Sequence, residues 1–473
     1  MPRGWGFLLG SPIDADRNRA AWARVARATT SGFLTQMQSL RDFYEMLDRS
    51  QWWSADKIVA WQRQQLNFLL NHARNTSPFY KFRLNGVFRY DGSIDWDRWH
   101  RIPIVTRANA VEHFDAILSR SPPAQHGPFR DYESSGSTGH PVTVRTPRWL
   151  IETSRACNWR AYRWGQLDWS RTRLFTAAED KERVVGDDVG PWGPPWLAAA
   201  QRGRNIYSHY HTPFPDRFRL MLENDVSYHA TSASTASRLV EEARSAGVQV
   251  HLDTLLIRGG AVDDALRHDL RETFGADVLE FYSSKECGAI AQPCPEGAGY
   301  HVNAETVLLE VVDADGMPVA PGEAGRAVIT PFMSTAFPLI RYDQGDVVIA
   351  GGECDCGRGL PTFASISGRE RHFLRHPDGR KSDRTLPNEA RALIGAGQVQ
   401  IAQVGPTNFE VRYTTREWGI PHDEAKFTQV FRETYFDDAN VTFVRMPEIP
   451  LSPTGKFLMF VVEWQGDSTA LAG

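Results

Sequence analysis

The stretch that decides the fold reads Tyr132-Glu133-Ser134-Ser135-Gly136-Ser137-Thr138-Gly139-His140-Pro141-Val142-Thr143-Val144. Four hydroxyl side chains and two glycines lie within six consecutive positions. Hydroxyl groups and freely turning backbone N–H groups can converge there on the oxygens of a phosphate. The β-branched run that follows predicts a return to a strand. The sequence therefore predicts a phosphate-binding loop made of Ser134, Ser135, Gly136, Ser137, Thr138 and Gly139, with an ordinary Ser/Gly turn as the alternative.

Four further motifs follow the Ser/Gly loop in a fixed order along the chain. They are Phe281-Tyr282-Ser283-Ser284-Lys285-Glu286-Cys287-Gly288, Arg341-Tyr342-Asp343-Gln344-Gly345-Asp346, Gly368-Arg369 and Pro453-Thr454-Gly455-Lys456. In order and spacing, the five motifs resemble the core motifs of the adenylate-forming superfamily, which includes acyl-CoA synthetases, nonribosomal-peptide adenylation domains and luciferases. Within it, the chain is most similar to the phenylacetate-CoA ligase and CapK-like branch. The resemblance extends from about Trp52 to Glu463.

This resemblance implies an AMP-forming carboxylate ligase that uses ATP and Mg²⁺. A carboxylate attacks the α-phosphate of ATP, pyrophosphate leaves, and an acyl-adenylate remains for transfer to an acceptor. The protein must mainly supply positioning and positive charge for this reaction. A rival hypothesis is a catalytically inactive, zinc-stabilised binding or regulatory protein of the same fold.

The resemblance also implies roles for single residues around ATP. Tyr282 would stack on the adenine, Asp346 would accept the ribose hydroxyls, and Arg369 would contact the ribose or the α-phosphate. The Ser/Gly loop would hold the β- and γ-phosphates. In many relatives a lysine follows the last glycine of that loop, whereas His140 stands there in this chain, which removes a positive charge at neutral pH. The alternative roles are a turn-forming Asp346 at a strand end and a surface Arg369.

Two residues are expected to act on the reacting groups. Glu286 is the predicted Mg²⁺ ligand, because a hard cation between phosphates needs a carboxylate oxygen. Lys456 lies in a turn near the C-terminus, from which a long ammonium side chain can reach the developing charge between the carboxylate and the α-phosphate. The alternatives are an exposed strand-end glutamate and a solvated lysine.

A second group of residues suggests a metal. Cys294, His301, Cys354 and Cys356 lie in or beside two Gly-rich turns, and three thiolates with one imidazole suit a closed tetrahedral Zn²⁺ site. Some ligases of this branch carry a similar C-x-C-G-R turn. Ordinary reduced thiols are the alternative. The two other cysteines, Cys157 and Cys287, are interpreted as buried apolar residues.

The substrate pocket is expected between three segments of the chain. Its predicted residues are Tyr207, His209, His211, Gly259, Gly260, Ala261 and Ser283. These aromatic and polar side chains favour an aromatic or polar carboxylic acid over a long alkyl chain.

The acyl acceptor stays open among coenzyme A, a carrier-protein thiol, an amine and a hydroxyl. In many relatives an acidic hinge residue follows Gly-Arg by two or three positions. This chain runs Gly368-Arg369-Glu370-Arg371-His372-Phe373, without that acid. We therefore expect free coenzyme A to be a poor second substrate, although any loop residue can absorb a hinge rotation.

Length and composition narrow the expected number of domains, the kinds of partner and the cellular compartment. A chain of 473 residues suggests two or three domains. The formal net charge of −4, without a dense block of Lys or Arg, speaks against nucleic acid or an anionic membrane surface as a partner. Five cysteines without framework spacing suggest a reducing compartment. The apolar patch near the N-terminus is too short for a signal-peptide core or a membrane span, so we expect a cytoplasmic protein.

Hydrophobic periodicity predicts an α/β fold. Helices are expected at 33–47, 58–70, 147–167, 218–222, 234–247, 265–274 and 426–434, with strands at 255–257 and 278–281. Alternating strands from 304 to 349 predict a β-rich subdomain. We expect a large multi-layered N-terminal domain over residues 1–368 and a small, mobile α+β C-terminal domain over residues 369–473.

Overall fold

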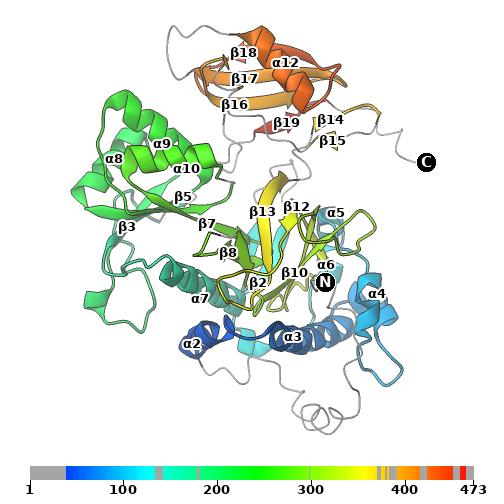
Figure 1. Ribbon diagram of the computed structural model, residues 1–473. Coiled ribbons are helices and arrows are strands. Elements are labelled where there is room, and N and C mark those ends of the chain that lie inside the picture. Colours follow the sequence, from blue (N-terminus) through cyan, green and yellow to red (C-terminus); the bar gives the residue numbers. More distant parts are fainter. Residues whose placement is uncertain are drawn as a thin grey trace. The chain divides into compact units, whose positions relative to one another are not determined.

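The computed structural model describes residues 39–133, 142–177, 182–260, 262–297, 299–369, 374–378, 381–382, 390, 393–415, 423–450 and 459–464 (Figure 1). The chain forms two compact units, each built from separate segments. The first unit comprises Met1–Ser170, Pro191–Gly203 and Leu279–Ser367. The second comprises Arg171–Gly190, Arg204–Val278 and Gly368–Gly473. The predicted domain boundary after residue 368 stays a prediction.

The helices of the first unit lie mainly in its N-terminal segment. They are α2 (Leu40–Ser50), α3 (Ala55–Thr76), α4 (Tyr80–Arg83), η3 (Asn85–Val87), η4 (Trp96–Arg101), α5 (Arg107–Glu112), α6 (Phe114–Ile117), η5 (Ala124–His126), α7 (Arg148–Trp164) and η6 (Ala199–Gln201). Side-chain caps define several starts: the hydroxyls of Ser39 and Ser54 accept backbone N–H groups in the first turns of α2 and α3. The helices predicted at 58–70 and 147–167 correspond to α3 and α7.

The strands of the first unit form two sheets. The strands are β1 (Phe129–Glu133), β2 (Thr143–Pro147), β7 (Asp277–Ser284), β8 (Gly288–Pro293), β9 (Tyr300–Val302), β10 (Val307–Val312), β11 (Ala324–Pro331), β12 (Tyr342–Ala350) and β13 (Thr362–Arg369). β1 and β2 make a two-stranded antiparallel sheet, and the others follow the order β10-β11-β12-β13-β9-β8-β7. The pairs β10–β11 and β11–β12 are the β-rich region predicted at 304–349.

A buried ionic cluster joins α2 and α7 to the turn before β10. Arg160 of α7 is 1% exposed, and its guanidinium donates to Glu305 at 2.7 Å and to Asn303 at 2.8 Å. Ser50, at the end of α2, donates to the same carboxylate oxygen as Arg160 Nη1, Oε1 of Glu305, at 2.6 Å. Every charge in this cluster therefore has a partner, as buried ions require.

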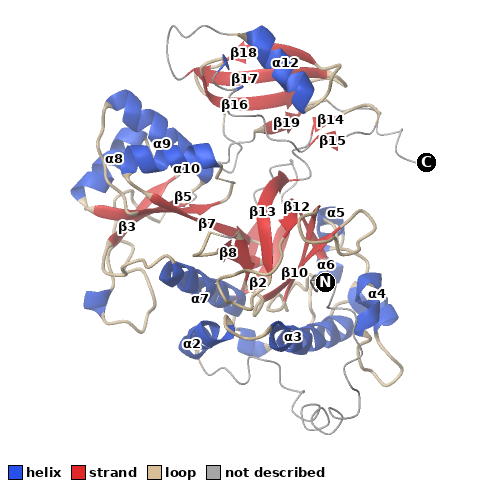
Figure 2. Cartoon of the chain, in the orientation of Figure 1, coloured by secondary structure: helices blue, strands red, loops and turns tan. Residues whose placement is uncertain are grey.

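The second unit contains a parallel sheet with helices on one face (Figure 2). Its strands β3 (Thr172–Ala177), β4 (Asn205–His209), β5 (Val226–Thr231) and β6 (Thr254–Arg258) follow the order β6-β5-β3-β4. The helices are α8 (Phe214–Glu223), α9 (Ala233–Ala246) and α10 (Asp264–Phe274). Their apolar faces and those of the strands form one core that includes Leu174, Leu239 and Ile257. In such sheets, ligands bind beyond the carboxyl ends of the strands.

The C-terminal segment of the second unit has a small sheet and core of its own. The order is β18-β17-β16-β19, from β16 (Ala396–Gln403), β17 (Asn408–Thr415), β18 (Asn440–Arg445) and β19 (Phe460–Val462), while β14 (Leu374–Arg375) pairs with β15 (Lys381–Ser382). Helix α12 (Glu424–Thr434) lies across the larger sheet (Figure 1). Phe427 and Phe431 of α12 pack against Phe409 and Val411. This helix was predicted at 426–434.

Candidate active site

The Ser/Gly loop connects two strands whose ends pair with each other. Glu133, the last residue of β1, lies opposite Thr143, the first residue of β2. Val142 is fully buried, and β2 begins at the next residue, Thr143, so the chain returns to a strand as predicted. Ser134, Ser135, Gly136, Ser137, Thr138 and Gly139 lie outside the described residues. The described part thus gives the two residues, Glu133 and Val142, between which the predicted phosphate loop lies.

The turn between β7 and β8 carries Glu286 to the start of that loop. Ser284 closes the turn, since its Oγ accepts the backbone N–H of Cys287 at 3.0 Å. Gly288 has φ +75°, and a Cβ there would collide with Oγ of Ser154, so only glycine fits. Lys285 donates from Nζ to the backbone carbonyl of Glu133 at 2.8 Å. This bond ties the turn with Glu286 to the entry of the Ser/Gly loop.

Arg107 is a site residue that the sequence analysis missed. Its guanidinium lies 3.7 Å from the carboxylate of Glu286, whose side chain is 6% exposed. Arg107 is the first residue of α5, and Thr106 and Asn109 form a capping box there. Val105 fixes the segment by backbone hydrogen bonds to Arg341 and Asp343, both at 2.9 Å. No signal in the local sequence would have paired Arg107 with Glu286.

Asp346 lies inside β12, so its predicted position at a strand end is wrong. The pairing of β11 with β12 is regular at Arg326↔Val347 and Val328↔Asp343, with an irregularity between them. Gly345 takes φ +74° there, a conformation that glycine adopts without strain. The bulge re-aims the carboxylate of Asp346, which accepts the hydroxyl hydrogen of Tyr282 at 2.8 Å.

Tyr282 and Asp346 therefore form a buried pair on neighbouring parts of the first unit. They are 6% and 5% exposed. The ring of Tyr282 packs edge-on against Phe363, with centroids 5.8 Å apart. The predicted stacking of Tyr282 on adenine and the predicted ribose contact of Asp346 stay predictions.

Arg341, the first residue of the same motif, is a structural anchor. It is 1% exposed and pairs with Glu310 at 3.2 Å. Its guanidinium also donates to the carbonyls of His100 and Ile102, at 2.7 and 3.0 Å. These bonds hold the chain segment before α5, and hence Arg107, beside β12.

Two predicted ATP-site residues are not described in full. Arg369 is the last residue of β13, and its side chain lies outside the described atoms. Lys456 lies in 451–458, also outside the described residues. Both roles stay predictions.

The predicted acid-binding residues of the second unit lie at the carboxyl ends of its parallel strands. His209 ends β4, and its Nδ1 accepts the backbone N–H of His211 at 3.1 Å. Gly259 and Gly260 follow β6 with φ +79° and +88°, and the carbonyl of Gly259 accepts the N–H of Ala233 at 3.2 Å. The loops after β5 and β6 are thereby joined.

Three further residues of the predicted pocket differ in exposure or placement. Tyr207 is fully buried within β4. Ser283 is exposed and belongs to the first unit. Ala261 lies outside the described residues.

A buried polar network under these strand ends was missed by the sequence analysis. The hydroxyl of Thr176 contacts Ser208 Oγ at 2.8 Å and His229 Nε2 at 3.0 Å. Arg217 donates to the same hydroxyl at 3.2 Å. Burial, together with the nearby Arg217, lowers the pKa of His229 to about 3, so the imidazole is neutral at physiological pH. These hydrogen bonds place a layer of buried polar side chains beneath this end of the sheet.

The four predicted zinc ligands converge in the first unit. The ligand atoms of Cys294, His301, Cys354 and Cys356 all lie within 4.8 Å of one another. The sulfurs of Cys294 and Cys354 are 3.6 Å apart, and Cys356 Sγ lies 3.2 Å from His301 Nε2. Two sulfurs bound to one tetrahedral zinc at about 2.3 Å are separated by roughly 3.8 Å, so the cluster has the right size.

The surroundings of His301 also fit a metal ligand. Its Nδ1 lies 3.3 Å from the carbonyl of Leu360, which favours the tautomer that leaves Nε2 as a lone-pair donor. Burial lowers the pKa of His301 to about 4, so the ring is neutral near pH 7. The other two cysteines, Cys157 and Cys287, are 0% and 2% exposed, as predicted.

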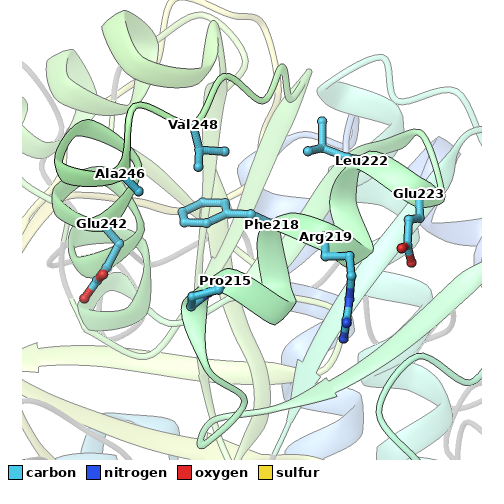
Figure 3. A pocket seen from close by; sticks show the side chains of 8 residues that line it. All are labelled: Pro215, Phe218, Arg219, Leu222, Glu223, Glu242, Ala246 and Val248. Carbon is cyan, nitrogen blue, oxygen red and sulfur yellow. The ribbon is translucent and has the colours of Figure 1, made fainter.

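A surface groove of about 410 Å³ on the second unit contains none of the predicted site residues (Figure 3). It lies between α8 and α9 and is floored by Phe218 and Val248. The side chains of Arg219 and Glu242 at its rim are largely exposed. It offers an apolar floor and no convergent polar groups, so we assign it no catalytic part. Among the described helices, none is long and apolar enough to cross a membrane.

Comparisons with known proteins agree with the arrangement of these motifs. No family model matches the chain. The chain is 32% identical to a phenylacetate–coenzyme A ligase of Thermus thermophilus over 341 residues, which cover 67% of this chain and 72% of the relative. It is 23% identical to a phenylacetate–coenzyme A ligase of Escherichia coli over 309 residues, covering 62% and 67% of the two chains.

The same fold occurs among solved structures. A crystal structure of 2-hydroxyisobutyryl-CoA ligase in the postadenylation state, in complex with 2-HIB-AMP, superposes with a TM-score of 0.63 at 18% identity, covering 82% of this chain and 86% of that one. This likeness confirms the predicted α/β class, with a large N-terminal domain and a smaller C-terminal one. The resemblance noted from five short motifs is thus confirmed, and the chain belongs to the phenylacetate–coenzyme A ligase family of AMP-forming, adenylate-forming ligases.

Proposed function

We propose that this protein joins a carboxylic acid to coenzyme A at the expense of ATP. One carboxylate oxygen attacks the α-phosphorus of ATP, the bond to the bridging oxygen of the β-phosphate breaks, and pyrophosphate leaves. The sulfur of coenzyme A then attacks the acyl carbon, its proton is lost, and AMP leaves. The observation that carries the proposal is the Lys285–Glu133 hydrogen bond, which joins the Glu286 turn to the entry of the Ser/Gly loop.

The residues divide into groups that bind ATP and groups that act on the reacting atoms. Ser134 to Gly139 would hold the β- and γ-phosphates, and Asp346, held by Tyr282, would accept the ribose hydroxyls. Glu286 would hold Mg²⁺, which would supply positive charge beside the departing pyrophosphate. Lys456 would stabilise the transition state between carboxylate and α-phosphate.

Coenzyme A is the favoured acceptor because both curated relatives are named phenylacetate–coenzyme A ligases. This choice replaces our expectation that free coenzyme A is a poor second substrate. That expectation rested on the absence of a hinge acid near Gly368, and Glu370 to Phe373 lie outside the described residues. A carrier-protein thiol, an amine and a hydroxyl remain as weaker alternatives.

An aromatic carboxylic acid is the favoured substrate. The names of the relatives support it, as do the aromatic and imidazole side chains around His209 and His211. The neutral His229 and the hydroxyls of Thr176 and Ser208 would place uncharged polar groups below the strand ends, with the guanidinium of Arg217 beside them.

The Cys/His cluster supports a structural role for zinc. Three sulfurs and one imidazole leave no open coordination position on a tetrahedral ion, which is typical of structural sites. The zinc would join the β8–β9 turn to the turn before β13. Membership of a ligase family gives no support to the alternative of an inactive zinc-stabilised protein.

The experiment is a panel of carboxylic acids incubated with ATP, Mg²⁺ and the full chain, with and without coenzyme A. We expect AMP and an acyl-CoA product with an aromatic acid such as phenylacetate, and no acyl-CoA without coenzyme A. Acid-dependent AMP release with hydroxylamine but not with coenzyme A would contradict the assigned acceptor. No AMP with any acid would contradict the ligase assignment.

A further inference from the structure

Arg217, in the first half of α8, is a cation that is buried without an anionic partner. Its side chain is 0% exposed, and among the described residues it forms no ion pair with a carboxylate. Loss of hydration lowers the pKa of the guanidinium to about 10, so the group stays charged at physiological pH. Burial of a charge without an ionic partner costs folding free energy. A charged side chain at this position therefore indicates a role other than stability.

The guanidinium of Arg217 donates to the turn that connects β4 to α8. Nη2 donates to the backbone carbonyls of His209 and Tyr210 at 2.8 and 2.9 Å. Nε donates to the carbonyl of Thr212 at 2.9 Å. Nη1 donates to the hydroxyl of Thr176 in β3 at 3.2 Å. One side chain thus joins three carbonyls of the turn to the sheet, which suits a planar group with five donors in fixed directions.

The turn itself, residues 209–212, is closed by further hydrogen bonds. The N–H of Thr212 donates to the carbonyl of His209 at 3.0 Å, and the N–H of His209 donates to Oγ1 of Thr212 at 3.1 Å. The N–H of Tyr210 donates to the carbonyl of Ala177, the last residue of β3, at 3.1 Å. The turn contains His209 and His211, two of the residues predicted to line the acid pocket. Its conformation therefore decides where these two residues lie.

We propose that Arg217 is a positioning residue for recognition of the carboxylic acid, because it holds residues 209–212 in the conformation that the pocket requires. The inference rests on the proposed function and deepens it, since it names a residue behind the pocket that determines which acids bind. Arg217 acts through the turn and not on the substrate, because its side chain is fully buried. The alternative is that Arg217 only stabilises the fold.

Four variants of the full chain separate the two roles. Arg217→Lys keeps the charge but loses the planar set of donors, and Arg217→Met removes the charge at similar length. Thr212→Val removes the acceptor for the N–H of His209 and so loosens the same turn without removing the buried cation. Arg219→Met is the control, because Arg219 lies in the same helix, is 61% exposed and pairs with Asp216.

Three measurements are made on each variant and on the unaltered chain. Hydrogen exchange followed by mass spectrometry reports how well the N–H groups of residues 209–212 are protected. Equilibrium dialysis gives the dissociation constant for labelled phenylacetate. ATP–pyrophosphate exchange gives kcat, the separate KM values for phenylacetate and ATP, and the preference for phenylacetate over propionate as a ratio of kcat/KM values.

We expect Arg217→Met and Thr212→Val to speed hydrogen exchange in the turn and to raise the dissociation constant and the KM for phenylacetate by about tenfold or more, because small displacements of binding groups are costly. Arg217→Lys should lie between Arg217→Met and the unaltered chain. The preference for phenylacetate should fall, the KM for ATP should stay the same, and Arg219→Met should change nothing. A purely stabilising role would lower kcat through loss of folded protein and leave every KM unchanged.

Unchanged hydrogen exchange in the turn, or faster exchange with an unchanged dissociation constant for phenylacetate, would overturn the inference. If Arg217→Met does not fold, Arg217→Lys and Thr212→Val decide by the same criteria. The dialysis also separates this inference from the proposed function. If the unaltered chain binds phenylacetate and Arg217→Lys binds it more weakly, but no acid gives AMP, the ligase proposal fails while the role of Arg217 is upheld.

Discussion

The hydroxyl of Tyr282 in β7 donates to Oδ2 of Asp346, at the bulge in β12, at 2.8 Å. Both residues are almost fully buried. A carboxylate in such a place needs donors, because loss of hydration is otherwise uncompensated. The bond therefore fixes the orientation of the acid proposed to bind the ribose.

Replacing Tyr282 by Phe removes that donor and keeps the ring. We expect the free energy of unfolding to fall by about 1.5–3 kcal/mol, the range for hydrogen bonds to charged groups, and the KM for ATP to rise. Urea unfolding and steady-state kinetics measure the two effects. Tyr90→Phe is the control, since Tyr90 is exposed. A variant with normal stability and normal KM would show that the hydroxyl is dispensable.

Lys456→Ala is expected to lower the rate of adenylation by about a hundredfold or more while ATP binding changes little. A charge that acts only in the transition state contributes to kcat and not to ground-state affinity. Single-turnover formation of the acyl-adenylate, together with calorimetric titration of ATP, measures the two. A loss of ATP affinity as large as the loss of rate, or an unchanged rate, would contradict the role assigned to Lys456.

The Cys/His cluster predicts about one zinc per chain. Cys354→Ser combined with Cys356→Ser should release the metal and lower the melting temperature, because the binding energy of a structural zinc is also folding energy. Metal analysis by mass spectrometry and a thermal melt are the measurements. Cys157→Ala should keep the zinc, since Cys157 lies outside the cluster. Protein purified without chelator and found free of zinc would contradict the site.

Arg160→Met tests the buried ionic cluster. It leaves Glu305, which is fully buried, without its guanidinium partner, so we expect a loss of about 3–5 kcal/mol of folding free energy. Arg155→Met is the control, because Arg155 is 55% exposed and pairs with Glu152 on the same helix, where the expected loss is below about 1 kcal/mol. Similar unfolding curves for both variants would show that the buried pair contributes no more than the exposed one.

Sequence periodicity predicted the helices better than the strands. Helices α9 and α10 carry N-caps at Ser232 and Asp263 and left-handed glycines at Gly247 and Gly275, so local signals mark both ends. Strands β3, β4 and β5 were not predicted. β5 is buried along its whole length, so it lacks the alternation that identifies a half-exposed strand.

The site was predictable where residue types alone indicate the chemistry and unpredictable where it depends on packing. The four residues predicted to bind zinc come together as their residue types led us to expect. The pairing of Arg107 with Glu286 depends on how Arg341 anchors the segment before α5, which no local pattern encodes. The position of Asp346 likewise depends on a bulge in the pairing of β11 with β12.

The central claim, that this chain forms an acyl-adenylate, is tested most directly by ATP–pyrophosphate exchange in the absence of coenzyme A. We predict that labelled pyrophosphate enters ATP only when the correct carboxylic acid and Mg²⁺ are both present, and that Glu286→Gln abolishes the exchange. Exchange that is independent of any acid, or no exchange across a panel of aromatic and aliphatic acids, would contradict the account.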